Sequence, residues 1–120
     1  MSESNDEVCV WFNPSCSKCR GAKELLDERG VDAAYYRYLD DAPTREQLED
    51  VLRMLGTDDP RQMMRTGESV YDELALDGAS RDALLDAMVA HPILVERPIV
   101  IRGDRAVIAR PPEKLLDLLP

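Results

Sequence analysis

The sequence has no apolar run that could cross a membrane, because no stretch approaches the roughly 18 apolar residues that a spanning helix needs. Its start also lacks the marks of a signal peptide. Residues 1–7 are polar and acidic, with neither a basic segment nor an apolar one. Both absences favour a cytoplasmic protein with no membrane partner, and this is what we expect.

Positive charge is also in short supply. Lys and Arg number 15 against 24 Asp and Glu, which gives a formal net charge of −9. Surfaces that bind DNA or RNA carry clustered basic residues, so the sequence argues against direct contact with nucleic acid. The length of 120 residues fits one domain with one core, and we expect a monomer that comprises residues 1–120 as a single domain.

Ligands for a metal ion are scarce. The chain has one histidine, His91, and three cysteines, whereas a structural zinc site uses about four such ligands. Cys9 lies inside an apolar segment, where we expect a small buried hydrophobic side chain. His91 precedes a proline at a predicted helix end, where the helix dipole accounts for it. We therefore expect no metal, and nothing in the sequence implies a bound organic cofactor.

The most informative feature that is present is a Cys-x-x-Cys motif, formed by Cys16 and Cys19 shortly after the apolar residues 8–12. A strand that ends in a Pro-containing turn and opens into a helix places Cys16 near several free backbone N–H groups. These groups favour the thiolate, which is the form that attacks disulfides and electrophiles. In a reducing compartment the motif indicates redox chemistry or metal binding, not a structural disulfide.

The order of elements in the N-terminal third predicts a parallel pair of strands. Residues 8–12 and 31–39 are rich in strand formers, and they flank a helix predicted over residues 17–29 that ends at Gly30. Strand, helix and strand in this order form a right-handed βαβ unit.

The C-terminal part returns to strands. Residues 98–109 predict an antiparallel hairpin around a Gly-containing turn. Pro111 or Pro112 can then begin a closing helix, and its residues expected to face inward are Leu115, Leu116 and Leu119.

The middle of the chain is predicted to be wholly helical. Thr44 and Gln47 have capping-box spacing, and further helix starts are indicated at Pro60, Ser69 and Ser80. The full order is β-α-β, helices, β-β-α. It predicts a thioredoxin-like α/β fold with an inserted helical subdomain at about residues 43–92.

Residues 13–20, Asn-Pro-Ser-Cys-Ser-Lys-Cys-Arg, resemble the active-site turn of the glutaredoxin-coupled arsenate reductases, which share a wider family with the Spx-type regulators. The resemblance covers nearly the whole chain from Val8 onward. It continues in residues 43–48, 64–65, 71–74, 91–100, 109–113 and 116–120.

The resemblance implies a site. Cys16 corresponds to the nucleophile, and the three arginines that surround the oxyanion correspond to Arg65, Arg97 and Arg110. Guanidinium groups suit this role because they donate bidentate hydrogen bonds to a tetrahedral anion and lower the pKa of a nearby thiol. Arg97 also precedes Pro98, where the thioredoxin fold is expected to keep a cis-proline beside the active thiol. We add to the predicted substrate-binding residues Asn13 and Arg20, which belong to the same turn.

Two positions depart from the family pattern. Phe12 stands where the reductases often have a histidine, so activation of the thiol must depend on the helix terminus and the arginines. Cys19 stands where many members have serine. A thiol one helical turn after Cys16 can reach it to form a disulfide, so Cys19 is either a resolving cysteine or a tolerated replacement of serine.

The resemblance implies that arsenate is bound by the arginines and attacked by Cys16, after which a thiol reduces As(V) to As(III). The resemblance implies that this thiol is glutathione, followed by glutaredoxin. Cys19 could serve instead, and the resulting Cys16–Cys19 disulfide would then be reduced by thioredoxin, glutaredoxin or another low-molecular-weight thiol. Two alternatives stay open. One is an Spx-type redox-sensing regulator that binds RNA polymerase, and the other is a generic thiol-disulfide oxidoreductase.

Overall fold

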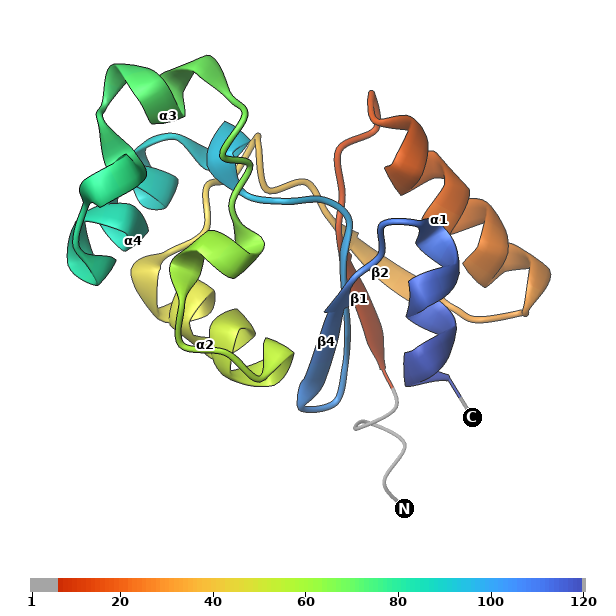
Figure 1. Cartoon of the computed structure of the whole chain (residues 1–120). Helices are drawn as coiled ribbons and strands as arrows, with labels where there is room; N and C mark the ends of the chain where they lie inside the picture. The colour runs from red at the N-terminus through yellow and green to blue at the C-terminus, as the bar shows by residue number, and fades with distance from the viewer. Residues whose placement is uncertain (1–6, 120) are drawn as a thin grey trace. The chain divides into compact units, whose positions relative to one another are not determined.

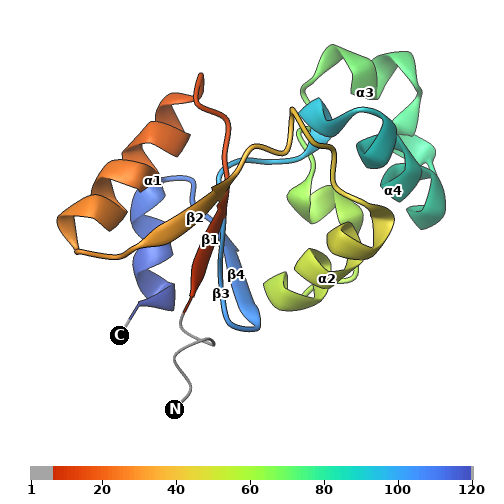
Figure 2. The same cartoon turned by 180° about the vertical axis from the view of Figure 1, so that it is seen from behind.

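The computed structural model describes residues 7–119 (Figures 1 and 2). Its internal contacts divide the chain into two compact units. The first, here called the sheet unit, comprises Met1–Tyr38 and Arg97–Pro120, and the second, the helical unit, comprises Leu39–Glu96. The helical insertion predicted at about residues 43–92 falls within the second unit.

The sheet unit contains four short strands in the order β2-β1-β3-β4. Their bounds are Val8–Trp11 for β1, Ala33–Tyr36 for β2, Ile99–Arg102 for β3 and Arg105–Ile108 for β4. β1 runs parallel to β2, and helix α1 (Ser17–Glu28) joins them, which confirms the predicted βαβ unit. β3 is antiparallel to both β1 and β4, so the predicted hairpin is also confirmed.

Helix α1 and the C-terminal 3-10 helix η5 (Pro112–Leu118) lie side by side on one face of the sheet (Figures 1 and 2). Apolar side chains from both helices and from the strands beneath them bury one another there, which is the main source of stability for a unit of this size. This core consists of Val8, Val10, Ala22, Leu26, Val100, Ala109, Leu115 and Leu118.

The closing helix differs from the prediction in its inward face. Leu115 is buried as predicted, but Leu118 is buried as well, while Leu116 and Leu119 are only half-buried at the edge of the core. The reason is the helix type. A 3-10 helix has three residues per turn, so positions 115 and 118 share a face, whereas the prediction assumed α-helical spacing.

The helical unit is built from short helices, three of them α and three of them 3-10 within the described residues. Their bounds are Arg45–Leu55 (α2), Pro60–Met63 (η2), Ser69–Glu73 (α3), Leu76–Gly78 (η3), Arg81–Ala90 (α4) and Pro92–Leu94 (η4). Side-chain ion pairs from Arg45 to Asp82 and to Asp86 join α2 to α4.

The starts of α2, η2 and α4 follow capping signals in the sequence. The Thr44 hydroxyl accepts a hydrogen bond from the Gln47 backbone N–H at 3.1 Å, and the Gln47 side chain accepts one from the Thr44 N–H at 2.8 Å. Asp59 and Ser80 cap η2 and α4 in a similar way. Each cap satisfies backbone donors that a helix leaves free at its first turn, which is why the starts were predictable.

A two-segment ladder closes the helical unit near its end. The Arg65 backbone N–H donates to the Leu94 carbonyl at 2.7 Å, and the Glu96 N–H donates to the Met63 carbonyl at 2.8 Å. These bonds flank an isolated antiparallel bridge. The ladder therefore fixes the backbone of Arg65 beside the segment that leads directly into Arg97.

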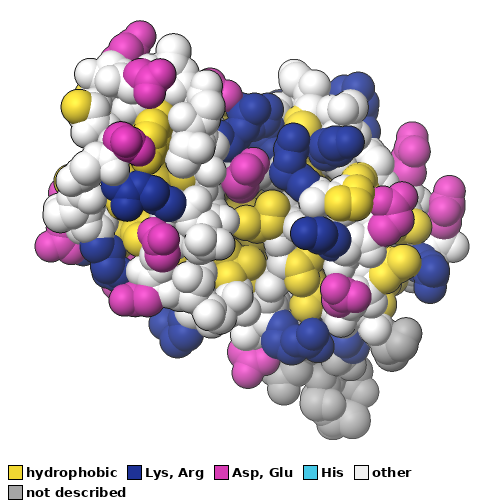
Figure 3. All heavy atoms as spheres, in the orientation of Figure 1, with side chains coloured by type: hydrophobic (Ala, Val, Ile, Leu, Met, Phe, Trp, Pro, Cys, Tyr) yellow, Lys and Arg dark blue, Asp and Glu magenta, His cyan; other side chains and the backbone are white. Residues whose placement is uncertain are grey.

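The surface is mixed in charge. Figure 3 shows basic side chains interspersed with acidic ones on the face drawn, although the chain is acidic as a whole.

Among the described residues, Leu39 and Leu74 are the only large apolar side chains classed as exposed. In the same residues, no helix is both long enough and apolar enough to traverse a bilayer.

We expect Gly56→Ala to destabilise the protein by about 1–2 kcal/mol, because Gly56 ends α2 in the left-handed region at φ 82°, where a Cβ atom is disfavoured. The matched control is Gly67→Ala. Gly67 has equally open surroundings but no positive φ, so its replacement should leave stability unchanged or slightly raised. Urea unfolding measures both, and equal midpoints for the two variants would contradict the expectation.

Candidate active site

The turn between β1 and α1 is shaped by two of the predicted site residues. The Asn13 carbonyl accepts a hydrogen bond from the Cys16 N–H at 3.0 Å, and the Asn13 side-chain oxygen accepts one from the Ser15 N–H at 3.0 Å. Arg20 reaches back from α1 and donates from Nη1 to the Pro14 carbonyl at 3.1 Å. Both side chains therefore hold the turn that presents Cys16. Their predicted contact with substrate stays a prediction.

Cys16 is the N-cap residue of α1, at the point where the helix begins with Ser17. Burial of its sulfur raises the pKa, but the backbone N–H groups of Cys19 and Lys18, the Cys19 thiol and the positive charge of Arg97 lower it. The lowering effects are larger together, so the pKa of Cys16 lies below its ordinary value. A half-buried thiol with a lowered pKa has the properties of a nucleophile.

Cys19 has the opposite character. Its side chain is fully buried, and burial together with the nearby Cys16 raises its pKa to about 11. The Asn13 backbone N–H donates to its sulfur at 3.4 Å, and Arg97 also lowers the pKa, but these effects do not offset burial. At neutral pH Cys19 is therefore a protonated thiol, and it lies beside a thiol whose pKa is lowered. Both cysteines are free.

Two predicted arginines meet at the start of β3 and the end of β4. The Arg97–Pro98 peptide bond is cis, as predicted, and the Arg110–Pro111 bond is cis as well. Arg110 donates from Nη1 to the Arg97 carbonyl at 2.9 Å. Arg97 itself has two buried guanidinium nitrogens, Nε and Nη1, with no hydrogen-bond partner. Buried polar groups without partners are costly, and an anion is a partner that these two nitrogens could take.

Arg65 belongs to the helical unit, and the other predicted site residues belong to the sheet unit. Its guanidinium contacts the Glu68 carboxylate, and its Nε lies 3.9 Å from Oε1 of Glu96. Sequence reasoning missed both carboxylates. The spacing of three residues between Arg65 and Glu68 was a usable signal, whereas nothing local links Arg65 to Glu96.

Two further positions bear on the predictions. Phe12, which stands where a histidine is common, packs edge-on against Tyr35 with ring centroids 5.2 Å apart. Position 12 therefore contributes packing and no charge. Cys9 is half-buried instead of fully buried as predicted. The reason is its place on the sheet face opposite α1 and η5, where its strand neighbours Ala34 and Ile101 are not fully covered either.

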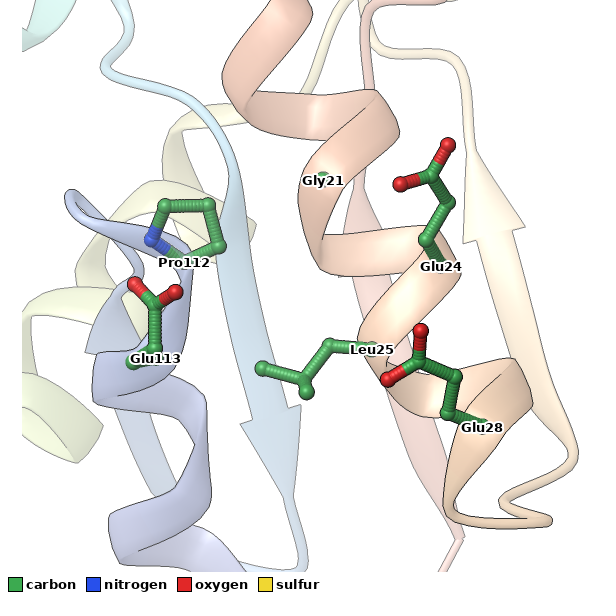
Figure 4. A pocket seen from close by; sticks show the side chains of 6 residues that line it. All are labelled: Gly21, Glu24, Leu25, Glu28, Pro112 and Glu113. Atoms are coloured by element: carbon green, nitrogen blue, oxygen red, sulfur yellow. The ribbon is translucent and has the colours of Figure 1, made fainter.

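A cavity of about 220 Å³ lies between α1 and η5 within the sheet unit. Leu25 points from α1 toward η5, and the lining includes three carboxylates, Glu24, Glu28 and Glu113 (Figure 4). Such a lining repels oxyanions, so the cavity is unsuited to the chemistry at Cys16. The two helices come close at its upper end, where a Cβ atom built on Gly21 would lie 3.1 Å from Cγ of Pro112.

In the part of the chain that the structure describes, no group of three or more His, Cys, Asp or Glu side chains could hold a metal ion. The arrangement at Cys16 consists of thiols, backbone N–H groups and guanidinium groups. Guanidinium and backbone N–H groups can bind an anion, and a thiolate can attack an electrophilic centre. The expectation of no metal and no organic cofactor stays a prediction.

Comparisons with known proteins agree with this chemistry. The model of the ArsC family matches residues 11–118. An arsenate reductase from Neisseria meningitidis serogroup A is 43% identical over 111 residues, which cover 91% of this chain and 95% of the relative. One from Haemophilus influenzae is 42% identical over 114 residues, or 93% and 98% of the two chains. The solved structure of an arsenate reductase from Vibrio cholerae superposes with a TM-score of 0.91 at 41% identity, covering 94% and 98%. These matches confirm the predicted resemblance and the thioredoxin-like fold.

We expect iodoacetamide to alkylate Cys16 with a pH midpoint below the roughly 8.5 of an ordinary cysteine, because the lowered pKa keeps its thiolate populated at lower pH. Cys19, which is buried and has a pKa of about 11, should stay unmodified over the same range. Mass spectrometry of the peptides at stepped pH measures both sites in one sample.

Arg97 offers a matched pair of variants for this measurement. Arg97→Gln removes a charge that lowers the pKa of Cys16, so the midpoint should rise, whereas Arg97→Lys keeps the charge and should keep most of the effect. A wild-type midpoint at or above the ordinary value would contradict the expectation, and so would identical midpoints in Arg97→Gln and wild type.

Proposed function

The chain belongs to the ArsC family, and from that membership we propose that it reduces arsenate to arsenite by thiol chemistry at Cys16. The observation that carries the proposal is the pairing of an activated thiol with an unsatisfied cation. Cys16 has a lowered pKa, and Arg97, which contributes to the lowering, keeps two buried guanidinium nitrogens without partners. A tetrahedral oxyanion bound by Arg97 supplies those partners and brings its central atom to the thiolate.

We propose that Arg110 and Arg65 complete the binding of the anion. The hydrogen bond from Arg110 to the Arg97 carbonyl supports this role, because it keeps the two arginines together in the sheet unit. The role of Arg65 rests on the family resemblance and on the ladder that fixes its backbone beside residues 94–96. Guanidinium groups suit arsenate because their parallel N–H donors match pairs of anion oxygens.

The proposed reaction begins with attack of the Cys16 thiolate on As(V). A sulfur–arsenic bond forms, and one arsenate oxygen leaves as water after protonation. A second thiolate then attacks the Cys16 sulfur. A disulfide bond forms as the sulfur–arsenic bond breaks, and the electron pair of the broken bond stays on arsenic, which leaves as arsenite. Two thiols are oxidised while arsenic is reduced by two electrons.

The second thiol has two candidate sources. Cys19 lies one helical turn after Cys16, and its thiol is near enough to lower the pKa of Cys16 by hydrogen bonding. With Cys19 as the source, the product is a Cys16–Cys19 disulfide that thioredoxin or glutaredoxin reduces. Glutathione followed by glutaredoxin is the other source, as the family resemblance implies. The three free cysteines suit the reducing conditions of the cytoplasm, where we place the reaction.

The two alternative functions make different demands on the site. A regulator that binds RNA polymerase needs the Cys16–Cys19 pair as a switch but has no use for an anion-binding arginine. A generic thiol-disulfide oxidoreductase likewise works without Arg65 or Arg110. The unsatisfied guanidinium of Arg97 and the relatives named arsenate reductase both favour the enzyme. Tight binding to polymerase without arsenate turnover would reverse this preference.

We expect arsenate-dependent oxidation of NADPH when the protein is supplied with a coupled thiol donor system, and its complete loss in Cys16→Ser, which has no nucleophilic sulfur. Glutathione with glutaredoxin and thioredoxin with its reductase are tested in turn, and arsenite is quantified as the product. Cys9→Ser is the matched control, because Cys9 lies in β1 outside the active-site turn. This variant should keep its activity.

The variant Cys19→Ser separates the two sources of the second thiol. Its activity should be lost with both donors if Cys19 completes the reduction, and it should survive with glutathione if an external thiol does. Full activity of Cys16→Ser would contradict the proposed function, whatever the result for Cys19.

A further inference from the structure

The two sulfurs of the active-site turn differ in their access to solvent. Cys16 is half-buried, and the residues on either side of it, Ser15 and Ser17, are exposed. Cys19 follows one helical turn later, and its side chain is 0% exposed. A small molecule in solution can therefore meet the Cys16 sulfur, whereas the Cys19 sulfur is shielded from it.

The same two sulfurs contact each other. Burial alone would raise the pKa of Cys16, but hydrogen bonds from backbone N–H groups and from the Cys19 thiol, with the charge of Arg97, lower it further than burial raises it. Cys19 keeps its proton, because burial raises its pKa to about 11. An oxidised product formed at the Cys16 sulfur therefore has a reducing thiol already beside it.

Arg97 adds hydrogen-bond donors to this pair, and all three residues belong to the sheet unit. Its positive charge acts on both sulfurs, and its Nε and Nη1 atoms are buried without a hydrogen-bond partner. A guanidinium group with free donors stabilises negative charge that develops on an oxygen atom during a reaction. The oxygen that leaves when a thiolate attacks a peroxide carries such a charge.

We propose that the protein also reduces hydroperoxides, with Cys16 as the nucleophile, Cys19 as the resolving thiol and Arg97 as the group that stabilises the leaving oxygen. Hydrogen peroxide and small alkyl hydroperoxides are uncharged near neutral pH. The net charge of −9 therefore does not oppose their approach as it opposes that of a dianion. This activity shares its nucleophile with the proposed arsenate reduction and is otherwise independent of it.

The proposed reaction has two steps. In the first, the Cys16 thiolate attacks one peroxide oxygen, and a sulfur–oxygen bond forms as the oxygen–oxygen bond breaks. The electron pair of the broken bond leaves on the other oxygen, which takes a proton from solvent and departs as water or an alcohol. Cys16 is then a sulfenic acid.

In the second step the Cys19 sulfur attacks the Cys16 sulfur. A disulfide bond forms as the sulfur–oxygen bond breaks, and the departing hydroxyl group takes the proton of Cys19 and leaves as water. Two thiols are oxidised while the peroxide is reduced by two electrons. A dithiol protein of the thioredoxin class then restores both thiols.

The test compares two electrophiles on the reduced full-length protein at one pH. Rate constants for Cys16 are measured with hydrogen peroxide and with iodoacetamide, whose leaving iodide is a weak hydrogen-bond acceptor. Ionisation of the thiol raises both rates, so it cancels in their ratio. The peroxide-to-iodoacetamide ratio should exceed that of free cysteine by about tenfold or more, the factor expected from one charged hydrogen bond. Equal ratios would overturn the proposal.

Variants of Arg97 separate leaving-group stabilisation from easier access of the smaller molecule. The ratio should fall toward that of free cysteine in Arg97→Gln, which has no charge, and it should fall less in Arg97→Lys, which keeps one. A high ratio that is the same in the wild type and in Arg97→Gln would be an effect of access alone and would overturn the proposal. Cys9→Ser is the matched control, because Cys9 lies in β1 outside the active-site turn.

The role of Cys19 is read from the mass of the protein after one equivalent of hydrogen peroxide. The wild type should lose two hydrogen atoms as the disulfide forms, whereas Cys19→Ser should gain one oxygen atom and stop at the sulfenic acid. A wild type that also gains oxygen and forms no disulfide would contradict the role of Cys19.

Failure of peroxide reduction is distinguishable from failure of the proposed function. If arsenate is reduced and the ratio equals that of free cysteine, the peroxide activity fails while arsenate reduction stands. If peroxide is reduced and arsenate is not, the proposed function fails alone. If Cys16 reacts with neither electrophile faster than free cysteine does, both fail together.

Discussion

The proposed chemistry of this protein depends on one electrostatic balance at the sulfur of Cys16. Burial favours the neutral thiol, while the backbone N–H groups of Lys18 and Cys19 and the charge of Arg97 favour the thiolate. The outcome is set by backbone geometry as much as by side chains. The turn held by Asn13 fixes the place of Cys16 at the helix start, and the strand after the cis Arg97–Pro98 bond fixes the place of the arginine.

The two cysteines of the motif share a turn and differ in every property that matters for thiol exchange. Cys16 is half-buried with a lowered pKa, and Cys19 is fully buried with a pKa of about 11. Because a thiolate is the attacking form, the difference favours Cys16 over Cys19 for the first attack in the proposed reaction. Cys19 becomes reactive only when it loses its proton. In the proposed reaction its thiolate then attacks the Cys16 sulfur, which by that stage carries the arsenic as an electrophilic group.

Much of the fold was predictable because its signals are local. The capping box at Thr44, the N-cap at Ser80, the helix-ending glycine at 56 and the alternation of strand formers act within a few residues. The lowered pKa of Cys16 was predictable for the same reason, since turn, thiol and helix start are contiguous. The predicted inward face of η5 was right at Leu115 but missed Leu118, because helix type depends on how the segment packs. The carboxylate of Glu96 beside Arg65 was missed because only the fold brings segments 30 residues apart together.

The close approach of α1 to η5 at Gly21 makes a helix-weakening residue the better choice at that position. Alanine in a helix interior is ordinarily favoured by about 1 kcal/mol over glycine. Here the added Cβ atom would lie 3.1 Å from Cγ of Pro112, so the rigid proline ring would have to move by a few tenths of an ångström. Arg110 lies two residues before that proline. Engineering for heat resistance by raising helix propensity should therefore leave this glycine alone, because the close approach that it permits lies two residues from Arg110, which we propose binds the anion.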